Sequence, residues 1–100
     1  MRKKVTHIKN KVFVKLLVPE IDKSYDIYLP INKKIGNIIN LLNQAISELT
    51  LGDIELSNEN SLFNAVTKEK YSPDVLLLNT NIRNGTTLIL IDEKQIVKDI

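Results

Sequence analysis

The stretch from Leu76 to Ile91 decides the fold, and it reads LLLNTNIRNGTTLILI. Within it, the pair Asn84-Gly85 separates two apolar runs. Taken alone, this pattern is typical of a type I′ β-hairpin, in which Leu76–Asn79 would pair with Thr87–Leu90. In the alternative interpretation, the pair forms a tight turn before a closing strand over Thr86–Ile91. Both interpretations predict an α+β domain, but with different strand orders.

The N-terminal part of the chain predicts a β-hairpin of its own. Residues Lys11–Val18 alternate with a period of two, which is typical of a strand with one core face. The inward residues are expected to be Val12, Val14, Leu16 and Val18. Pro19–Ser24 has the composition of a turn, and Tyr25–Leu29 alternates again. We therefore expect two antiparallel strands at the start of the domain.

An amphipathic helix is predicted next, with Asn32 as its N-cap. Apolar residues recur at steps of three and four, which places them on one stripe of a helix. These residues are Ile35, Ile38, Ile39, Leu42, Ala45, Ile46 and Leu49. Gly36 either permits close approach of the helix to the first strand or is simply tolerated near the N-terminus.

The middle of the chain predicts short elements. Gly52-Asp53 is a helix-stop signal, and a loop over 57–60 leads to a strand at Leu62–Val66. The register of that strand is open, because the run is apolar on both faces. After a turn over Thr67–Lys70, Tyr71 begins a minor strand, and a compact crossover follows from Ser72.

Composition limits the classes of protein to consider. One hundred residues make one domain, and the lack of Cys excludes a disulfide framework and cysteine chemistry. No apolar stretch has the length of a transmembrane helix, and no signal-peptide pattern follows the basic N-terminus, so we expect a cytoplasmic protein.

The positive charge is concentrated at the N-terminus. Five bases and no acid lie in the first eleven residues, which leaves nine bases against twelve acids elsewhere. The basicity therefore belongs to a flexible leader over 1–10 rather than to the folded part. The folded part is expected over 11–91, with a C-terminal tail over 92–100.

The order of these elements over residues 11–91 resembles the ubiquitin superfold, and most of all the EsaB/YukD-like family of type VII secretion accessory proteins of Gram-positive bacteria. The resemblance is carried by Leu29-Pro30-Ile31, Lys68-Glu69-Lys70-Tyr71 and the run Ile82–Leu88. It implies a ubiquitin-like β-grasp: a mixed five-strand sheet in the order 2-1-5-3-4, with one helix packed on one face. It also implies that Asn84-Gly85 is the turn before the central strand and not a hairpin. No Gly-Gly pair follows Ile91, so we expect a fold used for binding and not a conjugated or sulfur-carrying modifier.

Catalytic patterns are missing from the sequence. The only histidine, His7, lies in the leader, where no scaffold holds it near a nucleophile. Asp53-Ile54-Glu55 is a single acidic pair with no further ligand nearby, and three glycines do not form a phosphate-binding loop. We therefore expect a protein that is not an enzyme and that binds no metal, cofactor or small-molecule substrate.

The sheet face opposite the helix is the candidate interaction surface. If the helix covers the face with Val14 and Leu88, the other face exposes Phe13, Lys15, Leu17, Tyr28 and Ile89. In the alternative, the leader or tail shields this face, and Phe13 beside Tyr28 is ordinary cross-strand packing. The predicted function is a noncatalytic accessory or regulatory protein that makes protein contacts in type VII secretion. The alternative function is a small RNA- or ribosome-associated protein that binds through its basic leader.

Overall fold

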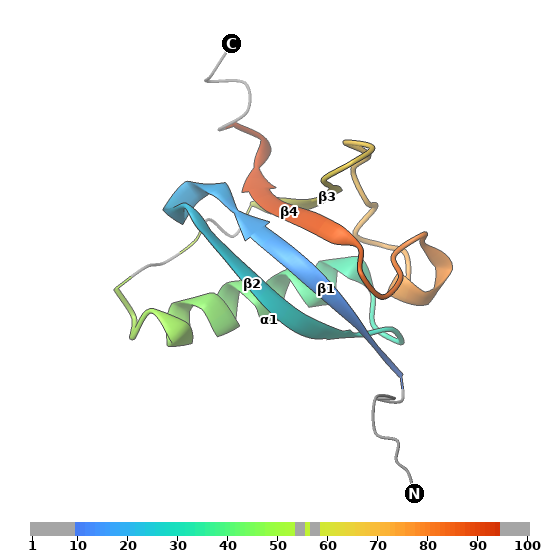
Figure 1. Cartoon of the computed structure of the whole chain (residues 1–100), viewed down its shortest axis with the longest axis horizontal. Helices are drawn as coiled ribbons and strands as arrows, with labels where there is room; N and C mark the ends of the chain where they lie inside the picture. Colours follow the sequence, from blue (N-terminus) through green and yellow to red (C-terminus); the bar gives the residue numbers. More distant parts are fainter. Residues whose placement is uncertain (1–9, 54–55, 57–58, 95–100) are drawn as a thin grey trace, which may run out of the picture.

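The computed structural model describes residues 10–53, 56 and 59–94. In this part of the chain four strands form one mixed sheet: β1 (Lys11–Val18), β2 (Lys23–Pro30), β3 (Asn60–Asn64) and β4 (Thr87–Asp92). Their order is β2-β1-β4-β3, with β1 and β4 parallel at the centre and antiparallel pairs outside them. One helix, α1 (Ile35–Leu49), crosses one face of this sheet (Figure 1). Short 3₁₀ turns occupy Pro19–Ile21 and Leu77–Asn79.

The core lies between α1 and the sheet, as the alternation of β1 predicts. Every second residue of β1, from Val14 to Val18, is buried, and the residues between them are not. The buried residues of the other strands and the helix include Leu29, Leu62, Leu88, Leu90, Ile35, Ile38, Ile39, Leu42 and Ile46. Ala45 and Leu49, which were predicted to join the helical stripe, are exposed. Ala45 lies about 80° round the helix from Ile35, at the edge of the stripe, and Leu49 lies in the last turn.

The prediction of a five-strand sheet in the order 2-1-5-3-4 is wrong. The described residues form four strands, and the predicted minor strand at Tyr71 is reduced to one bridge between Phe63 and Lys70. Two backbone hydrogen bonds flank this bridge, from Asn64 N to Glu69 O and from Tyr71 N to Leu62 O. Pro73 then begins a turn, and a proline has no N–H with which to continue a ladder.

The hairpin interpretation of Asn84-Gly85 is also wrong. β4 runs parallel to β1, with Lys15 opposite Thr87, while Leu76 bridges to Lys34. The turn closes with a hydrogen bond from Thr86 N to Arg83 O, and Gly85 has a φ of +92°. Asn84 has no positive φ, whereas a type I′ turn requires one at both central residues.

The start of α1 differs from the prediction that Asn32 caps it. The N-cap residue is Lys34, and no side chain caps the first amides. Instead Ile35 N donates to Val75 O and Gly36 N donates to Pro73 O, both at 2.9 Å. The crossover loop therefore satisfies these free amides. A Cβ on Gly36 would meet Pro73 O at 3.2 Å, so this glycine permits close approach of the loop and not of β1.

The predicted leader over 1–10 lies outside the described residues, apart from Asn10, and the predicted tail is described only from Asp92 to Lys94. Asn10 O accepts a hydrogen bond from Ile31 N at 3.0 Å, and Asp92 is the last residue of β4. Among the described helices, none is long and apolar enough to cross a membrane.

Candidate interaction surface

The sheet face away from α1 carries all five residues predicted for the interaction surface. Strand alternation determines this: Phe13, Lys15 and Leu17 fall between the buried residues of β1. Tyr28 precedes buried Leu29 on β2, and Ile89 lies between buried Leu88 and Leu90 on β4. We call this face, with its residues Phe13, Lys15, Leu17, Tyr28, Phe63, Thr87 and Ile89, the open face.

An aromatic pair lies at one end of the open face. Phe13 and Tyr28 are opposite each other in the β1–β2 register, and their ring centroids are 4.9 Å apart with an interplanar angle of 53°. This separation is typical of a favourable tilted aromatic pair. The rings pack on each other, as the cross-strand alternative predicts, yet Phe13 is still 40% exposed and Tyr28 47% exposed. Packing and exposure thus coexist at this pair.

A second apolar row crosses three strands near the other end of β1. Leu17 is opposite Ile89 in the parallel register, and Ile89 is opposite Phe63 in the antiparallel register. All three side chains are half-buried. Between this row and the aromatic pair, Lys15 is flanked by Asp26 on β2 and Thr87 on β4. The open face therefore has two apolar areas separated by a polar strip.

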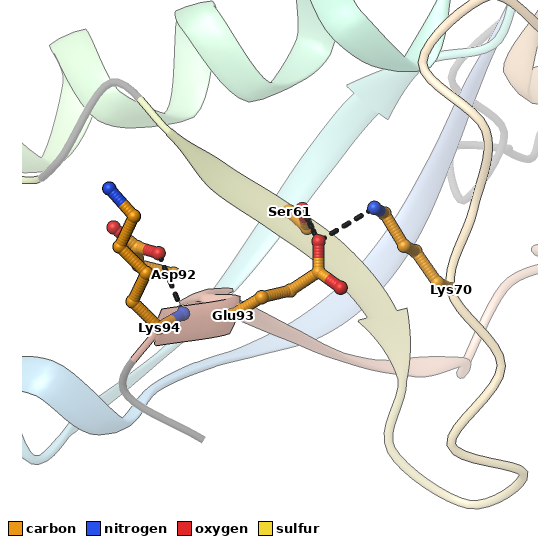
Figure 2. A network of polar contacts seen from close by, with 5 residues as sticks. All are labelled: Ser61, Lys70, Asp92, Glu93 and Lys94. Carbon is orange, nitrogen blue, oxygen red and sulfur yellow. Dashed lines mark hydrogen bonds and ion pairs between the residues drawn. The ribbon is translucent and has the colours of Figure 1, made fainter. Parts of the chain in front are cut away.

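The ends of β3 and β4 carry a polar network, which Figure 2 shows from close by. The Lys70 ammonium lies 2.7 Å from Glu93 Oε1, and the Ser61 hydroxyl donates to the same oxygen at 3.3 Å. The hydrogen bond from Lys70 lowers the pKa of the Glu93 carboxyl, since it favours the charged form. Nearby, Lys94 Nζ lies 2.9 Å from Glu59 Oε1, and this contact raises the pKa of Lys94. Both ion pairs link residues close to the ends of β3 and β4. Because they are exposed, each contributes little to the free energy of unfolding.

Within 10–53, 56 and 59–94, no group of three or more His, Cys, Asp or Glu side chains could hold a metal ion. His7 and Glu55, the second carboxylate of the acidic pair that begins at Asp53, lie outside the described residues. One open hollow of about 310 Å³ lies at the β1–β2 turn and another of about 360 Å³ lies beside Tyr71. Neither is lined by a histidine or a cysteine.

The chain is similar to known proteins in structure but not in sequence. No protein-family model matches it, and no curated protein does. Its structure is similar to the ubiquitin-like domain of the type VII secretion system protein EccD1 from Mycobacterium tuberculosis, with a TM-score of 0.62 and 16% identity, covering 82% of this chain and 98% of that domain. It is also similar to a ubiquitin-like domain of an Arabidopsis thaliana protein, with a TM-score of 0.62 and 8% identity over 93% of this chain and 89% of that one.

This chain has a ubiquitin-like fold. A third similar structure is a chain of the MycP5-free ESX-5 inner membrane complex, with a TM-score of 0.67 and 14% identity over 90% of the present chain. The ubiquitin-like domain described here spans only 26% of the length of that chain. Identities this low establish the fold alone.

The sequence prediction missed one aromatic residue of the open face, Phe63. Phe63 belongs to it because β3 buries Asn60, Leu62 and Asn64 on the core side. Two of these three inward residues are asparagines, so hydrophobic alternation could not fix the register of β3. Asn64 is accommodated because its Nδ2 donates to the Tyr71 hydroxyl at 3.0 Å and its Oδ1 accepts from Val66 N. A pattern of Asn-x-Leu-x-Asn before a turn was the available signal.

Proposed function

We propose that this chain is a noncatalytic, ubiquitin-like accessory or regulatory protein that acts through protein contacts in a bacterial type VII secretion system. The observation that carries the proposal is the aromatic pair of Phe13 and Tyr28, which is exposed on the sheet face away from α1. The shared fold with the ubiquitin-like domain of EccD1 supports the secretion context. The motifs around Leu29-Pro30-Ile31 and Ile82–Leu88 support membership of the EsaB/YukD-like family in Gram-positive bacteria, with the protein working in the cytoplasm.

Two physical effects favour docking at this pair: large aromatic side chains supply binding energy, and side chains that are already packed lose little conformational entropy when a partner binds. Interfaces gain most of their binding energy from a few large residues, and aromatic residues are enriched among them. Phe13 and Tyr28 project from paired strands and already pack on each other, so a partner has little left to immobilise. Leu17 and Ile89 would extend the apolar contact, while Lys15 and Asp26 would select the orientation of a partner through charge.

A second function, RNA or ribosome binding through the leader, is favoured by one observation, the five bases of the first eleven residues. The two functions differ in their dependence on salt. A complex held by phosphate contacts loses most of its affinity between about 50 mM and 200 mM salt, whereas an apolar contact does not. They also differ in the residues required, because the leader and the open face can be changed separately.

The proposal is tested by capture from a bacterium that has a type VII secretion system. Three tagged proteins are compared: the full chain, a chain lacking residues 1–9, and the double variant Phe13→Ala/Tyr28→Ala. We expect the first two to retain identified secretion components at both salt concentrations and the double variant to lose them. If the chain lacking residues 1–9 captured nothing, and RNA were recovered with the full chain only at low salt, the RNA-binding function would replace the proposal.

A further inference from the structure

We propose that Asn84 is a site of spontaneous deamidation, and that its hydrogen bonds with Phe13 control the rate. The chain has eleven asparagines, and Asn84 is the only one followed by glycine. Asn84 and Gly85 are both exposed, in the turn that leads into β4. Glycine has no side chain to hinder attack by its own backbone nitrogen, so an Asn-Gly pair has the least steric protection against this reaction.

The reaction needs no reagent other than water. The Gly85 backbone nitrogen loses its proton and attacks Asn84 Cγ, which forms a C–N bond. The bond from Cγ to the amide nitrogen breaks, and ammonia leaves with the proton. The product is a five-membered succinimide. Water then adds to either of its two carbonyls and opens the ring to aspartate or to isoaspartate, in which the backbone runs through the former side chain.

The folded turn holds both reacting groups in hydrogen bonds to one residue. Asn84 Oδ1 accepts from Phe13 N at 2.8 Å, and Gly85 N donates to Phe13 O at 2.8 Å. Ring closure requires the Gly85 nitrogen to lose the proton that Phe13 O accepts, and the Asn84 amide to rotate away from Phe13 N. Both bonds must therefore break first. The rate is set by the local opening of this turn and not by its solvent exposure.

The turn has a second support that can be removed without changing the reacting groups. Arg83 N donates to Thr86 Oγ1 at 2.9 Å. Thr86→Val removes this acceptor and keeps the branched shape of the side chain. Thr67→Val is the matched control, because Thr67 Oγ1 accepts from Glu69 N at 3.2 Å in the turn after β3, away from Asn84.

Deamidation also has a structural consequence. Aspartate at position 84 still offers an oxygen to Phe13 N, whereas isoaspartate adds a backbone atom to the turn and moves this oxygen away. The isoaspartate product therefore detaches the start of β1 from the turn that precedes β4, at Phe13, whose ring lies on the open face. This inference does not depend on the proposed function.

The test is peptide mapping by mass spectrometry, with aspartate and isoaspartate peptides separated, during incubation at mildly alkaline pH. In buffer, we expect deamidation of Asn84 to be at least about tenfold slower than in the urea-unfolded chain, which corresponds to an opening free energy of about 1.4 kcal/mol. Thr86→Val should speed it several-fold and Thr67→Val should not, with circular dichroism confirming that both are folded. Equal rates in buffer and urea, faster reaction at another asparagine, or equal effects of the two variants would each overturn the proposal.

Discussion

The backbone amide of Phe13 donates a hydrogen bond to the side-chain oxygen of Asn84 at 2.8 Å, although 71 positions separate them in the sequence. The bond lies two residues before Lys15, where the parallel pairing of β1 and β4 begins, and Gly85 N donates to the carbonyl of the same Phe13 at 2.8 Å. Phe13, which exposes its ring on the open face, is thus positioned by a side chain from the last fifth of the chain.

Asn84→Ala should lower the free energy of unfolding by about 1 kcal/mol, because one hydrogen bond to a backbone amide is lost. Asn84→Asp should cost less, since its carboxylate still accepts from Phe13 N. Urea denaturation followed by circular dichroism measures both. Equal losses for alanine and aspartate would contradict the role of the side-chain oxygen.

Ile39→Asp should destabilise the domain by several kcal/mol, which is comparable to the whole stability of a small domain. Ile39 is buried between α1 and the sheet, and a carboxylate there would have no partner. Leu41→Asp is the matched control, since Leu41 lies two residues away on the same helix and is 47% exposed. Thermal melting should separate the two variants clearly, and similar melting temperatures would show that α1 packs differently.

Tyr71→Phe should cost about 1 to 3 kcal/mol, the range for leaving a buried polar group without its partner. The Tyr71 hydroxyl accepts from Asn64 Nδ2 at 3.0 Å and donates to Asn81 Oδ1 at 2.6 Å. Tyr28→Phe removes a hydroxyl from an exposed tyrosine and should change the unfolding free energy little. A Tyr71→Phe variant as stable as the Tyr28→Phe variant would show that this network contributes nothing.

The Glu93 carboxyl should titrate at a lower pH than an ordinary glutamate, because the Lys70 ammonium donates to it and lowers its pKa. Since its pKa is lower in the folded state, the stabilising effect is present above the unfolded-state pKa and is lost as the pH falls through the folded-state pKa. Lys70→Met should raise the Glu93 pKa, while Lys94→Met, which removes the partner of Glu59, should not. Side-chain carboxyl NMR titration measures each, and an unchanged Glu93 pKa in Lys70→Met would contradict the assignment.

The sequence predicts correctly those elements whose position and inward face are determined by hydrophobic burial alone. β1 alternates Val14, Leu16 and Val18 with exposed or half-buried residues, and the stripe from Ile35 to Ile46 repeats at helical spacing. A burial pattern of this kind determines both the element and its inward face.

The parts that could not be predicted depend on polar contacts between distant segments. The register of β3 depends on the bond between Asn64 and Tyr71, and the start of α1 depends on carbonyls of Pro73 and Val75. A local sequence pattern does not identify hydrogen-bond partners that lie in distant segments of the chain. The same holds for the open face: its residues on β1, β2 and β4 follow from alternation, whereas Phe63 follows only from the register of β3.

The most direct test of the central claim, that the open face docks a partner needed for secretion, is export by a host that requires this protein. We compare Phe13→Ala/Tyr28→Ala with Leu41→Ala/Leu78→Ala, a control that truncates exposed apolar residues outside the open face. Both should keep melting temperatures close to that of the unchanged protein, because exposed side chains lose little on truncation. The first variant should abolish export and the second should preserve it. Normal export by a folded Phe13→Ala/Tyr28→Ala variant would contradict the claim.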